Sequence, residues 1–301
     1  MSKTLPAVFR EELMRSFLQK FFCTLLFFSL TAPVQASSYL EMDLEALMEV
    51  TVTSLSKRKE RLFDSAAALC VLTSGDIRRS GATRIEEALR MVPGLMVAQN
   101  SSWIWSISSR GRSCNPTYEN KLLVLIDGQS VYSPLFSGTL WETINLNMEH
   151  IDRIEVIRGP GGSTWGSNAV NGIINIITKS AEKTTGTVAK VRIGEKGNNA
   201  VAFSFGDDIF SGDYRLYGNF RKQQEAFVED ELKTRTIGFR LDSAPDLDSS
   251  LYVSGDIFSG TNEGTVWYPD LKAKEHLPFF IDEKLNKLRF NSGYSSHFSA
   301  D

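Results

Sequence analysis

The sequence is poor in histidine and cysteine, which excludes much of the chemistry that these residues perform. Its 301 residues include three histidines, His150, His276 and His297, and three cysteines. A nucleophilic cysteine is usually activated by an adjacent base such as histidine. No histidine lies near a cysteine in this sequence. A cysteine enzyme is therefore not indicated.

Excess positive charge is also absent. The formal net charge is −3, and the longest basic tract is Lys57-Arg58-Lys59. Proteins that bind DNA or RNA draw most of their sequence-independent affinity from clustered Lys and Arg. No nucleic-acid partner is therefore expected. The chain is 42% hydrophobic and 23% charged, which is typical of a folded protein.

No apolar run is long enough for a membrane-spanning helix. The run from Phe21 to Leu30 is far shorter than the roughly 20 residues that a spanning helix needs. Arg15 and Lys20 precede it, and the small-residue stretch Val34-Gln35-Ala36 follows. This order of positive, apolar and small residues predicts a secretory signal peptide over residues 1–36. The protein is then exported.

Export would leave two cysteines in the mature chain, because Cys23 leaves with the signal peptide. An oxidising compartment would permit a disulfide between Cys70 and Cys114. The alternative is a buried Cys70 in a strand over residues 68–72 and a free Cys114 in a loop. The lack of a framework of paired cysteines favours this alternative.

Residues 62–182 mix helical and strand patterns. Thr83 and Glu86 have the spacing of a capping box, which predicts a helix start. Ile85, Ala88, Leu89 and Val92 then fall on one helical face before Pro93-Gly94 ends the helix. Three segments of this region read as strands, namely Lys121–Ile126, Ile151–Ile157 and its expected partner Gly172–Thr178. Asp127-Gly128 predicts a tight turn after the first of them. The region is expected to be an α+β domain with a small mixed sheet and short helices.

Residues 183–301 lose the helical period and alternate apolar with polar residues. The alternating segments are Tyr214–Arg221, Thr236–Asp242, Leu251–Ile257 and Lys287–Tyr294. The stretches Gly194–Asn198 and Asp207-Asp208 read as turns between strands. Such strands suit an antiparallel transmembrane β-barrel with an apolar outside, or a soluble antiparallel sheet with one wet face. The signal peptide favours the barrel. About six strands are expected, too few to close a large plugged barrel, so the barrel is incomplete and the chain looks like the front part of a longer protein.

Residues 159–166 contain four glycines, which raises the question of a phosphate-binding loop. A P-loop needs a Lys after its last Gly, but Ser167 stands there, and a dinucleotide fingerprint needs Gly where Thr164 stands. A nucleophile elbow fails at Trp165. No paired carboxylates and no metal-binding His cluster lie nearby. The sequence therefore predicts no enzyme activity, no catalytic residue, no cofactor and no metal site.

Four blocks in this part of the chain carry a resemblance to a known family. They are Leu89–Leu95, Ile107–Gly111, Leu125–Tyr132 and Ile151–Thr178, which includes the glycine cluster. In this order they resemble the plug domain of TonB-dependent outer-membrane receptors, and the resemblance covers residues 45–185. It implies a plug inside a barrel in the outer membrane. It also implies uptake of a bulky ligand such as a ferric siderophore or cobalamin, energised by TonB with its ExbB and ExbD partners.

The resemblance also assigns roles to residues. An N-terminal extension over residues 37–61 contains a stretch that resembles the TonB box: Glu49, Val50, Thr51, Val52 and Thr53. An extended, β-branched segment of this kind can add to a sheet edge of TonB. The alternative is that Leu44, Leu47, Met48 and Val52 simply pack on the plug.

Two plug arginines, Arg110 and Arg158, match positions that pair with barrel glutamates in the family and hold the plug in place. Their partners are expected beyond residue 301. Four aromatic residues in two expected loops are candidates for contact with the ligand: Trp103, Trp105, Phe136 and Trp141. For Trp141, a place in the plug core is the alternative.

The sequence thus supports three functional hypotheses. The first is a TonB-dependent receptor that imports a bulky nutrient. The second is a truncated, non-transporting periplasmic or surface protein whose plug binds a ligand or partner. The third is a nucleotide-using enzyme, which would need phosphate binding at the glycine cluster. On the first hypothesis those glycines form a turn and lead into a strand of the plug.

Overall fold

The structure is a computed structural model that describes residues 51–52, 60–61, 68–109, 120–135, 137–209, 212–224, 230–246, 249–270 and 275–296. All of them lie in one compact unit, Leu44–Asp301. The expected signal peptide, Cys114, Arg110 and Phe136 fall outside the described residues. No helix within the described ranges is both long and apolar enough to cross a membrane.

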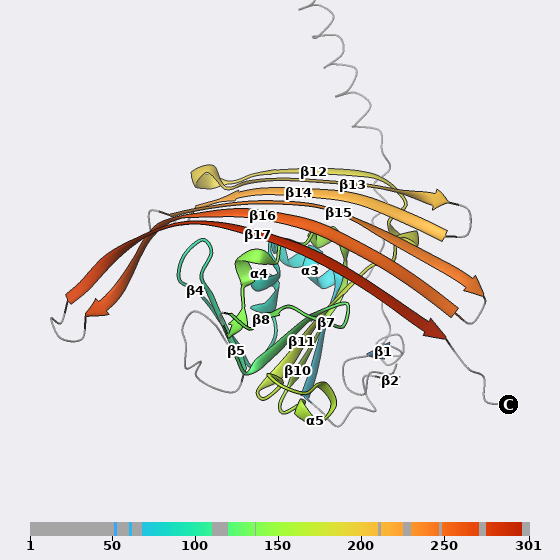
Figure 1. Ribbon diagram of the computed structural model, residues 1–301, viewed down its shortest axis with the longest axis horizontal. Coiled ribbons are helices and arrows are strands. Elements are labelled where there is room, and N and C mark those ends of the chain that lie inside the picture. The colour runs from blue at the N-terminus through green and yellow to red at the C-terminus, as the bar shows by residue number, and fades with distance from the viewer. Residues whose placement is uncertain are drawn as a thin grey trace, which may run out of the picture. The chain divides into compact units, whose positions relative to one another are not determined.

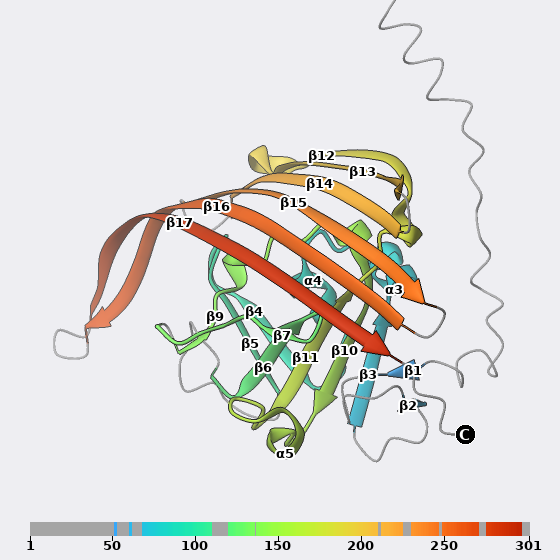
Figure 2. The same cartoon turned by 45° about the vertical axis from the view of Figure 1, so that its right-hand side comes forward.

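The first part of this unit is built on a five-stranded mixed sheet (Figures 1 and 2). Its order is β3 (Ala68–Thr73), β10 (Ile151–Arg158), β11 (Gly172–Thr178), β6 (Leu122–Ile126) and β7 (Gln129–Ser130). β10 and β11 pair antiparallel, with Ile154 opposite Ile176, which confirms the predicted partnership. β11 and β6 pair in parallel. All five residues of β6 are buried, as expected for an apolar strand covered on both faces.

We call this first part, residues 68–182, the plug. Smaller elements complete it. They are α3 (Ser74–Ser80), α4 (Ile85–Leu89), β4 (Leu95–Gln99) paired with β5 (Trp105–Ser109), β8 (Tyr132–Ser133) paired with β9 (Gly138–Thr139), η3 (Trp141–Thr143), η4 (Met148–His150) and α5 (Gly162–Trp165). The main core cluster includes Ile85, Leu89, Trp105, Ile154 and Ile176. A second cluster, with Leu123, Ile157 and Ile173, covers the other side of the sheet.

The predicted capping box at Thr83 is wrong, although the predicted helical face is right. α4 begins after Arg84, which makes no side-chain cap, because the Thr83 amide donates to Glu87 and the Glu86 carboxylate is held by Arg84 instead. The capping box lies one helix earlier. There Thr73 and Asp76 exchange side-chain and backbone hydrogen bonds at the start of α3. Ile85, Ala88, Leu89 and Val92 are all buried, which confirms the apolar face of α4.

Close packing and backbone conformation explain the glycines of this cluster and Gly172, which begins the strand that follows it. A Cβ on Gly161 would lie 2.5 Å from the Ile173 Cδ1 atom, and a Cβ on Gly172 would lie 2.5 Å from the Ile157 carbonyl oxygen. Gly166 has a φ of 81°, which side chains rarely adopt. The cluster forms the predicted turn, which includes the short helix α5, and the turn packs against its own outgoing strand β11.

The second part is an antiparallel sheet of six strands in sequence order (Figure 1). After η5 (Glu182–Thr184) it comprises β12 (Gly186–Ile193), β13 (Asn199–Ile209), β14 (Gly212–Gln223), β15 (Asp230–Asp246), β16 (Ser249–Asp270) and β17 (Glu275–Ser296). Each strand pairs with its neighbours in the chain, and within the described ranges the outer strands β12 and β17 do not pair with each other. The number of strands and the open edges agree with an incomplete barrel.

One predicted turn in this sheet is wrong. The stretch Gly194–Asn198 does join β12 to β13, through the short helix η6 (Glu195–Gly197). Asp207 and Asp208, however, lie inside β13, opposite Tyr214 and Asp213 of β14. Two adjacent carboxylates resemble a turn in the sequence. A strand end tolerates them where both side chains are exposed, as they are here.

The two faces of the six-stranded sheet are reversed relative to a soluble protein. Apolar side chains such as Ile237, Ile257 and Leu288 are 59%, 66% and 76% exposed. The polar side chains between them, such as Arg215, Asn219 and Thr236, are at most 3% exposed. A soluble sheet with a wet polar face would show the opposite burial. The exposed face is suited to an apolar surrounding.

Candidate functional site: the interface between the plug and the six-stranded sheet

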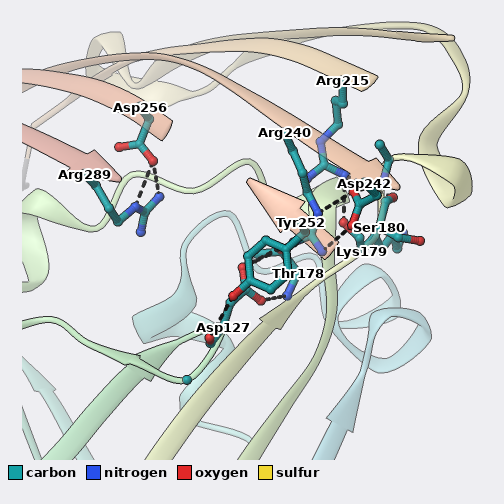
Figure 3. Close-up of polar contacts among 12 residues, drawn as sticks. Asp127, Thr178, Lys179, Ser180, Arg215, Arg240, Asp242, Tyr252, Asp256 and Arg289 are labelled. Atoms are coloured by element: carbon teal, nitrogen blue, oxygen red, sulfur yellow. Dashed lines mark hydrogen bonds and ion pairs between the residues drawn. The ribbon is translucent and has the colours of Figure 1, made fainter. Parts of the chain in front are cut away.

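Among the described residues, three buried contacts join the polar face of the sheet to the plug, and the first lies where β11 ends (Figure 3). The Arg240 Nη1 donates to the Thr178 Oγ1 over 2.8 Å and lies 3.5 Å from the Asp127 carboxylate. Asp127 also accepts from the Thr178 amide over 2.7 Å. The side chains of Arg240 and Asp127 are 9% and 12% exposed. This is a nearly buried, charge-assisted network between sheet and plug.

Local backbone geometry explains why Asp127 occupies this position. Asp127 and Gly128 have φ values of 49° and 79°, so they form the predicted tight turn between β6 and β7. The turn places the carboxylate beside Thr178 on the neighbouring strand β11. The Tyr252 hydroxyl donates to the Asp127 carbonyl over 3.3 Å, and the Arg240 guanidinium lies 4.6 Å from the centre of the Tyr252 ring.

The segment that leaves the plug is held by the same sheet. Asp242 accepts from the Ala181 amide over 2.8 Å and from the Arg240 Nε over 2.7 Å. The Arg215 Nη1 donates over 3.0 Å both to the Lys179 carbonyl and to the Thr184 hydroxyl. Arg215 is only 2% exposed. Two sheet arginines therefore satisfy acceptors on the plug and on the connection that follows it.

The second contact lies in the middle of the interface and is neutral. The Asn145 Nδ2 donates to the Thr236 hydroxyl over 3.1 Å, and the Asn219 Nδ2 donates to the Asn145 Oδ1 over 3.0 Å. The His150 ring contacts the Tyr217 ring edge-on, with 5.2 Å between centroids. Burial, aided by the nearby Arg215 and Lys179 charges, lowers the pKa of His150 to about 3, so this ring is neutral at pH 7.

A cavity of about 30 Å³ lies between the first and second contacts. Its lining includes Asp127, His150, Arg215, Arg240 and Asp256, with the Arg289 guanidinium paired to Asp256. This volume is comparable with one or two water molecules and is far too small for a nutrient. The cavity is part of the interface rather than a ligand site.

The third contact is centred on a buried ion pair in the plug. Arg84 and Glu86, 3% and 0% exposed, lie 2.5 Å apart. The Arg84 Nη1 donates to the Gln223 Oε1 on β14 over 2.7 Å and to the Ser102 carbonyl over 2.8 Å. The Ser102 amide donates to the Asp230 carboxylate at the start of β15. One buried guanidinium therefore connects a helix start, a plug loop and the sheet.

A carboxyl group near this contact has a perturbed pKa. The pKa of Glu142 is raised to about 7, chiefly by burial and to a smaller extent by the Glu86 and Glu283 carboxylates, against the lowering effects of a backbone hydrogen bond and of Arg84. Glu142 therefore titrates near neutral pH. Within the described ranges no group of three or more His, Cys, Asp or Glu side chains could hold a metal ion.

The structure describes only part of the predicted TonB box. Thr51–Val52 form β1, which pairs antiparallel with β2 (Glu60–Arg61). Glu49, Val50 and Thr53 lie outside the described residues. The extended backbone of Thr51–Val52 is compatible with the predicted box, which stays a prediction.

Of the two predicted plug–barrel arginines, the structure describes Arg158. Arg158 ends β10, opposite Gly172, and is half-buried against Gly94. It makes no ion pair among the described residues, and Arg110 lies outside them. The role predicted for both arginines therefore stays a prediction. Among the described residues, Arg215 and Arg240 of the sheet and Arg84 of the plug are arginines that do bond across this interface.

The three described tryptophans of the predicted ligand-contact set are buried. Trp105 and Trp141, 2% and 3% exposed, belong to the main core cluster, which favours the alternative considered for Trp141. Arg84 and Arg90 flank the Trp105 ring at 5.2 and 5.1 Å from its centroid. Trp103 is 4% exposed and lies against Gly264 of β16. A role in ligand binding for these residues and for Phe136 stays a prediction.

Cys70 lies in β3, opposite Val156, and is partly buried against the main core. Burial raises the pKa of its thiol. It is a free cysteine, as the alternative to a disulfide expected, whereas Cys114 lies outside the described residues.

The sheet arginines and Asp127 could not be identified as a site from the sequence. Alternation in β14 and β15 predicts that Arg215 and Arg240 point to the same face as Asn219 and Thr236. That signal indicates the face but not the partner. For Asp127 the sequence indicates only a turn residue.

A globular domain whose surface is covered on one side by the polar face of an antiparallel sheet, with the other face of that sheet apolar and bare, defines a plugged β-barrel membrane protein. Comparisons with known proteins agree with this class. Residues 61–173 match the TonB-dependent Receptor Plug Domain family. The vitamin B12 transporter BtuB of Vibrio vulnificus (strain CMCP6) is 28% identical over 255 residues, which are 84% of this chain and 40% of that protein.

Solved structures show the same fold. The ferripyoverdine receptor of the outer membrane of Pseudomonas aeruginosa superposes with a TM-score of 0.66 at 16% identity, over 83% of this chain and 34% of that one. The siderophore receptor PirA of Acinetobacter baumannii gives a TM-score of 0.52 at 24% identity, over 65% and 32% of the two chains. The chain thus spans well under half of the length of these relatives.

This chain contains a TonB-dependent receptor plug domain at residues 61–173, and the strands after it resemble the first part of the barrel of such a receptor. It is accordingly an outer-membrane protein, and its relatives are transporters and receptors rather than enzymes.

Proposed function

We propose that the protein of which this chain is a part imports a bulky nutrient across the outer membrane. The arrangement of the interface supports this proposal most directly. The polar face of the sheet is occupied by the plug through side chains such as Arg240 and Arg215, while the apolar face is left bare. The plug therefore blocks the interior, and transport requires an energy source that can move it.

The relatives support two substrate classes. The Vibrio vulnificus relative is a vitamin B12 transporter, and the structural neighbours are receptors for siderophores. We propose a ferric siderophore or cobalamin as the ligand. Both are large and bind to rigid aromatic and polar surfaces of outward loops.

The polar character of the contacts suits a plug that must move. The interface consists largely of hydrogen bonds and ion pairs, such as Asn145 to Asn219 and Arg84 to Gln223. Polar groups can exchange protein partners for water one at a time, so each contact costs little once water enters. A large apolar interface would instead resist separation in proportion to its area. Pulling by TonB, with ExbB and ExbD as its partners, is the energy source that we propose.

The experiment that tests this proposal uses the complete receptor with Val52→Pro. Strand addition to TonB needs an extended segment with free N–H groups, and proline removes one of them. We expect uptake of radiolabelled ligand to be lost while binding of that ligand at the cell surface is unchanged. The matched control is Val52→Thr, which keeps the β-branched side chain and the N–H and should retain uptake. Full uptake by the proline variant would contradict the role of the box.

A further inference from the structure

The apolar outer face of the six-stranded sheet changes character toward one end of the strands. Across β13, β14 and β15 the outward residues fall in rows fixed by the register. Phe203 and Gly218 lie opposite each other, and the next row contains Val201 and Phe220. The rings of Phe203 and Phe220 stack, with 6.4 Å between centroids. This apolar band then ends abruptly.

Cations occupy the rows at which the band ends. Arg235 lies opposite Phe220, and one row further Lys222 lies opposite Lys233. The side chains of Lys222 and Lys233 are 40% and 46% exposed, and Arg235 is exposed as well. Together with Asn199 they line an open cleft of about 310 Å³, which we call the basic cleft. Its floor is apolar, because Val201 and Phe220 line it too.

The basic cleft has fewer negative charges than positive ones. Glu231 pairs with Lys222 over 2.6 Å and also with Lys233, so one carboxylate serves two lysines. Arg235 makes no ion pair among the described residues. The next carboxylate is that of Glu263, which lies opposite Glu231 on the neighbouring strand β16. Lysines directly across a strand pair repel each other, so an anion in the cleft would be stabilising. Arg221, which also borders the cleft, is committed to the plug through the Thr83 carbonyl.

The lengths of the connections identify this end as the extracellular one. Outer-membrane barrels have short periplasmic turns and long extracellular hairpins. At the end that carries the basic cleft, β16 and β17 continue to pair beyond the start of β15, from Thr265 to Asp270. At the other end, only residues 210–211 and 247–248 separate successive strands. The cleft therefore faces the outer leaflet.

We propose that the basic cleft binds the phosphate headgroup of an outer-leaflet lipid, whose acyl chains lie along the apolar band. The guanidinium of Arg235 and the ammonium groups of Lys222 and Lys233 match a phosphate. Val201, Phe220 and Phe203 continue the apolar surface directly below the headgroup. A free phosphate ion would use the cations but not this surface. The proposal concerns the outside of the barrel and is independent of which nutrient is imported.

The test uses the complete receptor, purified in detergent and stripped of lipid, with bisphosphorylated lipid A as the probe. Binding is measured by native mass spectrometry for the unmodified receptor and for Lys222→Gln/Lys233→Gln/Arg235→Gln. We expect affinity to fall about fivefold for each cation removed and on the order of a hundredfold for the triple variant. Lys183→Gln removes an exposed cation at the other end of the sheet and serves as the control, with unchanged binding.

Two further measurements identify the source of the phosphate and the state of the protein. Lipid A without its phosphates should bind weakly to both forms, and inorganic phosphate should not bind at the same concentration. The triple variant should keep its thermal unfolding midpoint and its ligand uptake, because these side chains lie outside the plug interface. Unchanged lipid A affinity in the triple variant would overturn the proposal. Equal affinity for inorganic phosphate would overturn the assignment to a lipid.

Discussion

The guanidinium of Arg240 on the six-stranded sheet donates to the hydroxyl of Thr178, the last residue of β11 in the plug, over 2.8 Å. Asp127 lies beside both and accepts from the same hydroxyl over 2.7 Å. In this contact the cation belongs to the sheet and the acceptors belong to the plug. For Arg158 the reverse is expected, with the cation in the plug and the acceptor in the barrel. Any force that moves the plug must break a buried, charge-assisted network here.

Replacing Asp127 by Asn tests how much this network contributes. Asn tolerates the φ of 49° at this position and keeps the size of the side chain, but it lacks the charge that faces Arg240. We expect the receptor to lose about 1.5–3 kcal/mol of stability in chemical denaturation, the range for hydrogen bonds to charged groups. Amide exchange at Thr178, whose N–H donates to Asp127, should accelerate.

The control for this variant is Asp208→Asn, which removes an exposed carboxylate from β13. Because an exposed charge without a buried partner contributes little, stability should be unchanged within about 0.5 kcal/mol. If Asp127→Asn were as mild as Asp208→Asn, the network would not hold the plug.

For the buried ion pair of Arg84 and Glu86 we predict a larger change in stability. Arg84→Met leaves the fully buried Glu86 carboxylate without its partner, which costs about 3–5 kcal/mol. Arg84→Met combined with Glu86→Leu removes both charges, so the double variant should be more stable than the single one. Thermal unfolding of the receptor and of both variants completes the comparison. A double variant less stable than Arg84→Met would show that the pair itself is not the source of the cost.

Strand positions and faces in this protein could be predicted from the sequence because they follow from a period of two residues. The alternation of Leu216 with Tyr217 and of Ile237 with Thr236 correctly separates the exposed face from the buried one. The pairing of β10 with β11 also followed, because two extended segments lie on either side of a glycine-rich turn.

The partners of buried polar groups could not be predicted in the same way. Arg240 meets Asp127 across more than a hundred residues of sequence, and nothing local to either residue indicates the other. Thr73 rather than Thr83 forms the capping box, because the side chain of Glu86 is taken by Arg84. In the first case a tertiary contact decides the outcome. In the second, Arg84 is only two residues from Glu86, but its guanidinium is also bonded to Ser102 and Gln223, which the local sequence does not indicate.

Glu142 makes stability depend on pH with a defined sign. Its pKa rises from 4.5 in the unfolded chain to about 7 in the fold, so the folded state binds the proton more tightly. The resulting stabilisation is complete below pH 4.5 and is lost as pH rises from 4.5 to 7. Glu142→Gln removes this dependence. We expect the free energy of unfolding of the variant, relative to that of the unmodified receptor, to increase from pH 5 to pH 8 by up to about 3 kcal/mol.

The measurement is the difference in thermal unfolding midpoint between the two proteins across that pH range. Taking the difference cancels the contribution of His150, whose pKa of about 3 gives a dependence of opposite sign below pH 6.5. Glu182→Gln, an exposed carboxylate of η5, is the control and should show a constant difference. A constant difference for Glu142→Gln as well would contradict the raised pKa.

The glycine cluster and Gly172, the first residue of the strand that follows it, supply the last prediction, which separates a steric role from a phosphate-binding role. A Cβ on Gly172 would lie 2.5 Å from the Ile157 carbonyl oxygen, so Gly172→Ala must displace backbone in the central pair of strands. We expect a loss of about 1–3 kcal/mol in thermal or chemical unfolding of the receptor, as for overpacking in a core. Gly162→Ala is the matched control, because the nearest atom to its Cβ is 4.0 Å away and helix α5 accepts alanine. A phosphate loop would behave differently, since Gly162→Ala would then impair nucleotide binding without any need to change stability. Equal stability of the two variants would show that close packing does not explain the glycine at position 172.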